Sequence, residues 1–176
     1  MSDPADTIPG MTDRAFPPLR ADALTTLSAW LDFYRATLLG KCEGLTDEQL
    51  RTASVPPSSL TLLGLVQHLA AVERNWFRRV LAGEDVPPLY PRESGTGHDG
   101  GFEPGDAGIA GARAVWEEEV AHARRVVAAA GPEGTGTLDG NAVSVTWVLT
   151  HVIAEYARHT GHADLVRERI DGATGV

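Results

Sequence analysis

Four long segments of this chain repeat apolar residues every three or four positions, the spacing that lines one face of an α-helix. They span about residues 21–42, 58–83, 106–130 and 143–169. In the first segment the pattern is carried by Leu24, Leu27, Leu31, Tyr34 and Leu38. No strand pattern of useful length competes with these segments. Four such helices in one chain predict an all-α fold in which they pack as a four-helix bundle.

Capping residues indicate where some helices begin. Thr46 and Gln49 have the spacing of a capping box, which predicts a short helix between the first two long ones. Ser58 or Ser59 is the expected N-cap of the second long helix, because a serine side chain there can accept a hydrogen bond from a free backbone N–H group. The fourth long helix is expected to begin near Val143 or Ser144.

The remaining segments are expected to connect or precede these helices. The first 18 residues contain four prolines and little pattern, so residues 1–20 are predicted to be an extended or mobile segment before a bundle domain of residues 21–172. Residues 84–106 contain five glycines and four prolines. Loops of that length are usually functional or mobile, so this one either covers a site or is disordered. Residues 131–140 are expected to form a loop with a short extended piece at 135–138.

The overall composition excludes several classes of protein. A length of 176 residues with 43% hydrophobic content suits one domain with its own core. The net charge of −9 argues against a nucleic-acid partner, since phosphate binding needs a basic surface. No apolar run approaches the ~18 residues of a membrane helix, and no secretory signal is recognised. The single cysteine, Cys42, is expected to be a packing residue and fits a reducing cytoplasm.

Residues of the kind that bind metals gather on one face of the last helix. His151, Glu155, His159 and His162 fall within about 80° of one another around the helix axis. His68, on the second long helix, lies among apolar residues that face the core. Bundle metal sites are built from inward side chains of facing helices, so the pattern predicts a divalent-metal site. Spacing alone allows either 151 and 155 or 155 and 159 as the ligand pair, and the alternative is a solvated helix face.

Other polar and aromatic residues receive simpler interpretations. Glu73, one turn beyond His68, either fixes the imidazole of a ligand or is a surface charge, and the surface charge is favoured. The acidic run at residues 117–119 is expected to be a solvated face. The four tryptophans are expected in the core or in an interface, and an exposed aromatic patch would indicate a homodimer: Trp30, Trp76, Trp116 and Trp147.

Three stretches of the sequence resemble a known superfamily. They are GLTDEQL at 44–50, LTLLGLVQHLAAVERNWF at 60–77 and HVIAEYARHTGHADLVRERIDG at 151–172. Together they resemble the DinB-like metal-binding superfamily. The resemblance is strongest to the branch that holds mini-circle-type proteins and the N-terminal domain of mycothiol-dependent maleylpyruvate isomerase.

The resemblance implies a DinB-type four-helix bundle that holds one divalent ion on three side chains. One ligand is a histidine of the second helix, which corresponds to His68. The other two lie four residues apart on the last helix, and the register that keeps Gly161 in place makes them Glu155 and His159. A His-Glu-His set is similar to that of the isomerase branch. His151 and His162 then lie outside the ligand set, as candidates for acid–base catalysis.

This set of ligands suits zinc, and also nickel, iron or manganese. The resemblance implies that the ion activates a low-molecular-weight thiol, mycothiol or bacillithiol, toward a small electrophile. The leading hypothesis is therefore a metal-dependent thiol transferase or isomerase. One alternative is a metal-binding stress or accessory protein that catalyses nothing. Another is an iron oxygenase with two histidines and one carboxylate at its metal.

Overall fold

The computed structural model describes residues 14–90, 101–104, 106 and 108–175, and these residues are mostly helical. Within this part of the chain the α-helices are α1 (Ala23–Gly40), α2 (Asp47–Leu50), α3 (Leu62–Glu73), α4 (Ile109–Ala130) and α5 (Val145–Asp171). A π-helical segment, η2 (Arg74–Leu81), continues α3. The helical class predicted from the sequence is confirmed, with one addition, a two-stranded hairpin between α4 and α5.

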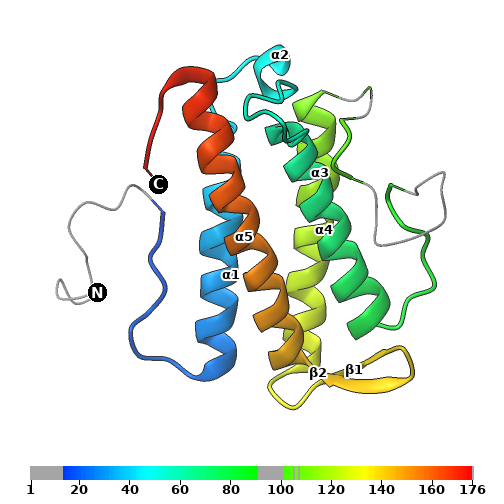
Figure 1. The fold of residues 1–176 in the computed structure, drawn as a ribbon. Helices are drawn as coiled ribbons and strands as arrows, with labels where there is room; N and C mark the ends of the chain where they lie inside the picture. Colours follow the sequence, from blue (N-terminus) through cyan, green and yellow to red (C-terminus); the bar gives the residue numbers. More distant parts are fainter. Residues whose placement is uncertain (1–13, 91–100, 105, 107, 176) are drawn as a thin grey trace.

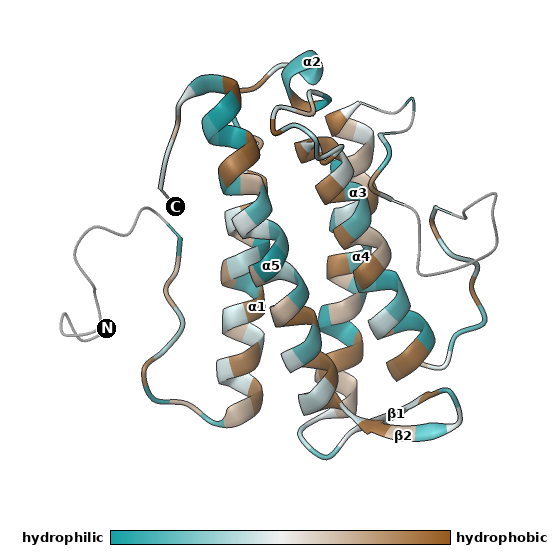
Figure 2. Ribbon diagram, viewed as in Figure 1, coloured by the Kyte–Doolittle hydropathy of each residue, from teal (hydrophilic) through white to brown (hydrophobic). Residues whose placement is uncertain are grey.

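The four long helices are α1, α3 with its continuation η2, α4 and α5. They lie side by side (Figure 1). α1 packs mainly against α5, and α3 packs mainly against α4 and also contacts α5. Each long helix carries both hydrophobic and hydrophilic residues along its length (Figure 2). The hydrophobic residues meet in one core, to which the four helices contribute Leu31, Leu65, Val120 and Val152 among others. Burying each such side chain contributes about 1.5–3 kcal/mol.

Side-chain caps mark where four of the helices begin, and Asp22 caps α1 by accepting a hydrogen bond from the backbone N–H of Thr25. Thr46 and Gln49 form the expected capping box at the start of α2. Ser144 caps α5 by accepting a hydrogen bond from the backbone N–H of Trp147. The expected N-cap of the second long helix was wrong, because Thr61 occupies that position and its hydroxyl accepts from Gly64 N at 3.0 Å. Ser58 instead accepts a hydrogen bond from the backbone of Leu60 in the preceding turn.

The hairpin before α5 consists of β1 (Thr135–Leu138) and β2 (Asn141–Ser144), paired antiparallel. From the sequence, only a short extended piece within a loop was expected here. The missed signal is the dipeptide Asp139–Gly140, whose φ angles of 49° and 80° suit a two-residue hairpin turn. The hairpin also packs against η2, since a Cβ atom at Gly136 would lie 2.2 Å from the carbonyl oxygen of Val80.

Glu73 is fully buried, so its interpretation as a surface charge was wrong. Arg35 of α1 donates to both of its carboxylate oxygens, from Nε at 2.8 Å and from Nη2 at 2.6 Å. The hydroxyl of Tyr156 donates to Glu73 Oε1 at 2.8 Å, and Trp116 Nε1 donates to that hydroxyl at 2.8 Å. Each long helix therefore contributes one residue to this network. The partners lie on other helices, which spacing along α3 cannot reveal.

Two shifted pKa values fit this network. Burial alone would lower the pKa of Arg35, but the charge of Glu73 and its hydrogen bonds outweigh burial and raise it. Burial, and then the charge of Glu73, raise the pKa of Tyr156 well above its ordinary value. At neutral pH the arginine is thus charged and the tyrosine hydroxyl keeps the proton that it donates.

The acidic run on α4 is only partly solvated, which corrects the expectation for residues 117–119. The Glu118 side chain is exposed, but Glu119 is buried. Glu119 accepts hydrogen bonds from Arg74 Nη1 at 3.1 Å and from Arg78 Nε at 2.7 Å. These two arginines lie on η2, so the two ion pairs to the buried Glu119 join the π-helical segment to α4.

Trp116 lies in the core as expected, whereas Trp147 is 47% exposed. Cys42 is buried and its thiol lies 3.6 Å from the backbone oxygen of Leu38, so the packing role is confirmed. Among the residues that the structure describes, no helix combines the length and the apolar character needed to cross a bilayer.

Candidate metal centre

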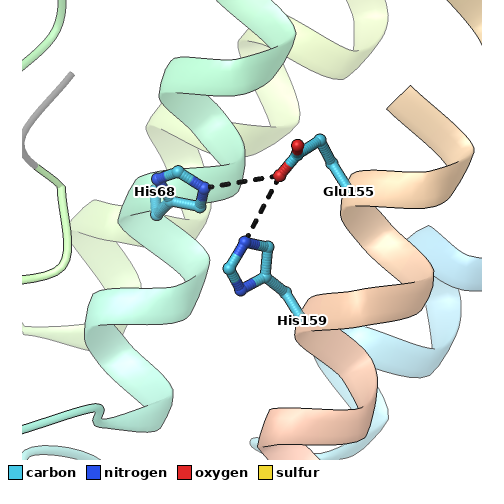
Figure 3. A group of neighbouring side chains, drawn as sticks. All are labelled: His68, Glu155 and His159. Atoms are coloured by element: carbon cyan, nitrogen blue, oxygen red, sulfur yellow. Dashed lines mark ion pairs between the residues drawn. The ribbon is translucent and has the colours of Figure 1, made fainter. Parts of the chain in front are cut away.

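His68 of α3 lies opposite Glu155 and His159 of α5, so the three residues expected as ligands come together. One ligand atom from each of them lies within 4.8 Å of the others. The Glu155 carboxylate extends toward both imidazoles (Figure 3). Its Oε2 atom is 4.0 Å from His68 Nε2 and 3.4 Å from His159 Nε2.

The helix geometry accounts for this arrangement. Residues 155 and 159 are one turn apart on α5 and therefore share a face. His68 lies between Leu65 and Leu69, both fully buried, so its side chain emerges beside the core. α3 and α5 are in contact, which places the two faces opposite each other.

The structure also distinguishes between the two ligand pairs that helical spacing allows, 151 with 155 and 155 with 159. His151 Nε2 lies 3.8 Å from Glu155 Oε1, the carboxylate oxygen that does not face His68 and His159. His68 instead groups with Glu155 and His159. The geometry therefore favours 155 and 159 as the pair that acts with His68.

The chemical state of these groups fits a divalent cation. Both ring nitrogens of His68 are buried and have no hydrogen-bond partner among the described residues. A buried polar atom without a partner costs about 1–3 kcal/mol, so a ligand for it would be stabilising. Burial, followed by the charge of His159, lowers the pKa of His68 to about 4. Burial also lowers the pKa of His159, although Glu155 opposes the shift. Neutral imidazoles with a carboxylate are a donor set suited to zinc.

A short loop segment covers the two imidazoles. The ring of Phe102 stacks on His68, with ring centroids 4.0 Å apart and planes at 17°, and its centroid lies 5.4 Å from that of His159. Gly101 makes this approach feasible, because it has φ +83° and a Cβ atom there would lie 2.8 Å from His68 Cα. Gly64 accommodates the loop on the α3 side, where a Cβ atom would lie 2.1 Å from the Phe102 carbonyl oxygen.

Phe102 belongs to the long loop that was expected either to cover a site or to be disordered, but nothing in the sequence singles out this residue. Residues 91–100 and 105 of that loop lie outside the described residues. No periodicity or motif marks Phe102. Its contact with His68 depends on where the loop returns to α3, which the sequence does not show. Gly64 and Gly101 are visible in the sequence, but their role in the close approach of the loop to α3 can be recognised only from the folded structure.

His151 lies one turn before Glu155 and belongs to an aromatic cluster. Its ring is parallel to Trp147, with centroids 5.2 Å apart and planes at 4°, and lies 4.4 Å from the ring of Trp76. The His151 side chain is 35% exposed. The imidazole of His151 thus packs against two tryptophan rings and remains accessible to solvent beside Glu155.

His162 lies one turn after His159 on α5, and its Nδ1 atom is 3.3 Å from Nδ1 of His159. It is thus directly linked to a candidate ligand, whereas His151 faces the other side of the Glu155 carboxylate. The two histidines expected to act in acid–base steps flank the triad of His68, Glu155 and His159 at opposite ends.

The model of one protein family, described as mycothiol-S-transferase, matches residues 26–172 of the chain. The match spans all the candidate site residues. A comparison with curated proteins finds no match. The matched family belongs to the DinB-like superfamily, which confirms the resemblance noted in the sequence.

Proposed function

Because the chain belongs to the mycothiol-S-transferase family, we propose that it is a metal-dependent transferase that joins a low-molecular-weight thiol to an electrophile. The observation that carries the proposal is the triad of His68, Glu155 and His159, whose ligand atoms lie within 4.8 Å of one another. We propose that the four long helices form a DinB-type four-helix bundle within a domain of residues 21–172.

The triad holds one divalent ion, for which zinc is the first candidate and nickel, iron and manganese are the others. Support comes from the two unpartnered ring nitrogens of His68 and from the neutral state of both buried imidazoles. The ion supplies Lewis acidity, which favours the thiolate form of a thiol at neutral pH.

The residues around the triad have separate tasks. Phe102 covers the imidazoles of His68 and His159 and excludes water from that side. His151, which is partly exposed, accepts the proton that the thiol loses. The thiol sulfur then forms a bond to an electrophilic carbon of the second substrate, and the leaving group departs with its electron pair. Histidine is the side chain that most often acts as a general acid or base in enzymes.

Mycothiol is the proposed thiol, on the strength of the family description, and bacillithiol is the alternative. A protein that uses such a thiol works where thiols are kept reduced, so we place it in the cytoplasm. The electrophile is a small molecule.

The test begins with metal content per chain, measured by mass spectrometry on the full-length protein. We expect about one ion in the parent and little in His68→Ala or His159→Ala. His122→Ala is the matched control, because this histidine of α4 pairs with Glu84 at 2.9 Å and not with the triad. The control should keep its ion. A parent that binds no divalent ion after loading would contradict the proposal.

The second step is an activity assay on the zinc-loaded protein with mycothiol, bacillithiol or cysteine and monochlorobimane. In this reaction the carbon–sulfur bond forms as the carbon–chlorine bond breaks and chloride leaves. We expect adduct formation above the uncatalysed rate with mycothiol, and its loss in His159→Ala. Zinc binding without accelerated adduct formation from any thiol would instead favour the non-catalytic metal-binding protein.

A further inference from the structure

His162 approaches His159 through one specific pair of atoms. The two Nδ1 atoms are 3.3 Å apart, and the rings meet edge to face at 62° with centroids 5.2 Å apart. A neutral imidazole has one N–H group and one nitrogen lone pair. A hydrogen bond between two such nitrogens therefore requires that one ring carry its proton on Nδ1 and that the other carry it on Nε2.

The position of the triad decides which ring is the donor. His159 Nε2 faces Glu155 Oε2 at 3.4 Å and is the nitrogen available to the proposed ion. A nitrogen that binds a metal must offer its lone pair, so the proton of His159 has to be on Nδ1. That N–H group then donates to Nδ1 of His162, and His162 carries its own proton on Nε2.

We infer that His162 is a positioning residue, which accepts a hydrogen bond from His159 and thereby fixes the tautomer and ring orientation needed for metal binding. The inference rests on the proposed metal site and assigns a task to a residue outside the ligand set. Histidine ligands commonly donate their second ring N–H group to such an acceptor, and its loss weakens metal binding. With Nδ1 engaged in this way, His162 can exchange protons with a substrate only through Nε2.

Two substitutions separate the acceptor from the bulk of the side chain. His162→Asn keeps an acceptor, because Oδ1 of asparagine lies at the same branch position as Nδ1 of histidine. His162→Leu keeps an apolar side chain of similar length but has no acceptor. His122→Leu is the matched control, a histidine on α4 that pairs with Glu84. The affinity of each full-length protein for zinc is measured against a competing chelator.

We expect His162→Leu to bind zinc about 10- to 100-fold more weakly than the parent. His162→Asn should stay within a few-fold of the parent, and His122→Leu should match it. Melting of the metal-free proteins checks that all variants fold. Parent-like affinity in His162→Leu would overturn the inference, and so would an equal loss in the leucine and asparagine variants.

A spectroscopic measurement tests the tautomer in the parent without any substitution. Long-range ¹H–¹⁵N correlation spectra of the zinc-loaded protein report which ring nitrogen of His159 is protonated. We expect the proton on Nδ1 of His159 and on Nε2 of His162. A proton on Nδ1 of His162 would overturn the inference even if zinc binds. A parent that binds no zinc would instead remove the proposed site, so the two failures are distinguishable.

Discussion

The hydroxyl of Tyr156 donates to Glu73 Oε1 at 2.8 Å and so connects α5 to α3 next to the candidate metal centre. The same hydroxyl accepts from Trp116 Nε1 on α4. Tyr156 directly follows Glu155 in α5, and Glu73 lies five residues after His68 in α3. α3 and α5 therefore carry residues of both the buried polar network and the triad.

Replacing Tyr156 with phenylalanine should destabilise the protein with little change in its packing. The substitution leaves Trp116 Nε1 without its acceptor and removes one donor from the Glu73 carboxylate. Loss of a partner by buried polar groups costs about 1–3 kcal/mol, and we expect the free energy of unfolding to fall by that amount. Urea unfolding measures it. Tyr34→Phe, at a half-buried tyrosine of α1, should change it by less than about 0.5 kcal/mol. Equal effects of the two substitutions would show that the hydroxyl of Tyr156 is unimportant.

Removing Arg35 should be more harmful than removing the whole ion pair. Arg35→Met leaves Glu73 buried and charged, with only Tyr156 as a donor, and such a loss costs about 3–5 kcal/mol. In the double variant Arg35→Met, Glu73→Leu no buried charge remains unpaired, so much of the stability should return. Unfolding of the parent, both single variants and the double variant gives the coupling energy. A double variant as unstable as the sum of the single ones would contradict this explanation.

Two glycines near the triad should respond to alanine with opposite signs. In Gly101→Ala the added Cβ atom would lie 2.8 Å from His68 Cα, and the alanine would have to adopt φ +83°. The substitution should therefore lower the free energy of unfolding by more than about 1 kcal/mol. Gly161 lies inside α5 with nothing within 4 Å of its added Cβ atom, and alanine there should raise the free energy of unfolding by about 0.5–1 kcal/mol. Thermal unfolding of the two metal-free variants provides the comparison. Stabilisation by Gly101→Ala would mean that the loop does not approach α3 as described.

The sequence predicted the long helices and the face of the last helix that carries the candidate ligands. Helical spacing places Glu155 and His159 on one face, and the apolar neighbours of His68 turn it toward the core. Spacing could not choose between His151 and His159, because both lie one turn from Glu155. The choice depends on how α3 lies against α5, and helical periodicity carries no information about that contact. Only the family resemblance indicated residues 155 and 159 before the structure was known.

The residues that were misinterpreted have partners far away in the sequence. Glu73 and Glu119 resemble surface charges until Arg35 and Arg78 are placed beside them. A buried carboxylate is recognised by its partner, and no local pattern identifies a partner on another helix. Phe102 is the same kind of case, since its contact with His68 depends on the path of a loop.

Cys42 should be unreactive in the folded protein, although it is the only thiol in the chain. Burial raises the pKa of Cys42 to about 12, despite the opposing charge of Arg167. The thiolate is the reactive form, so at pH 8 the native protein should react with Ellman's reagent far more slowly than the protein in urea. A thiol with a raised pKa stays protonated in the folded state while it ionises in the unfolded state. Its contribution to stability is therefore complete below about pH 9 and is lost as the pH rises toward 12. Cys42→Ala provides the control, with no reaction in either state. Rapid labelling of the native parent at pH 8 would contradict the burial of Cys42 and would require the mutant in every thiol-transfer assay.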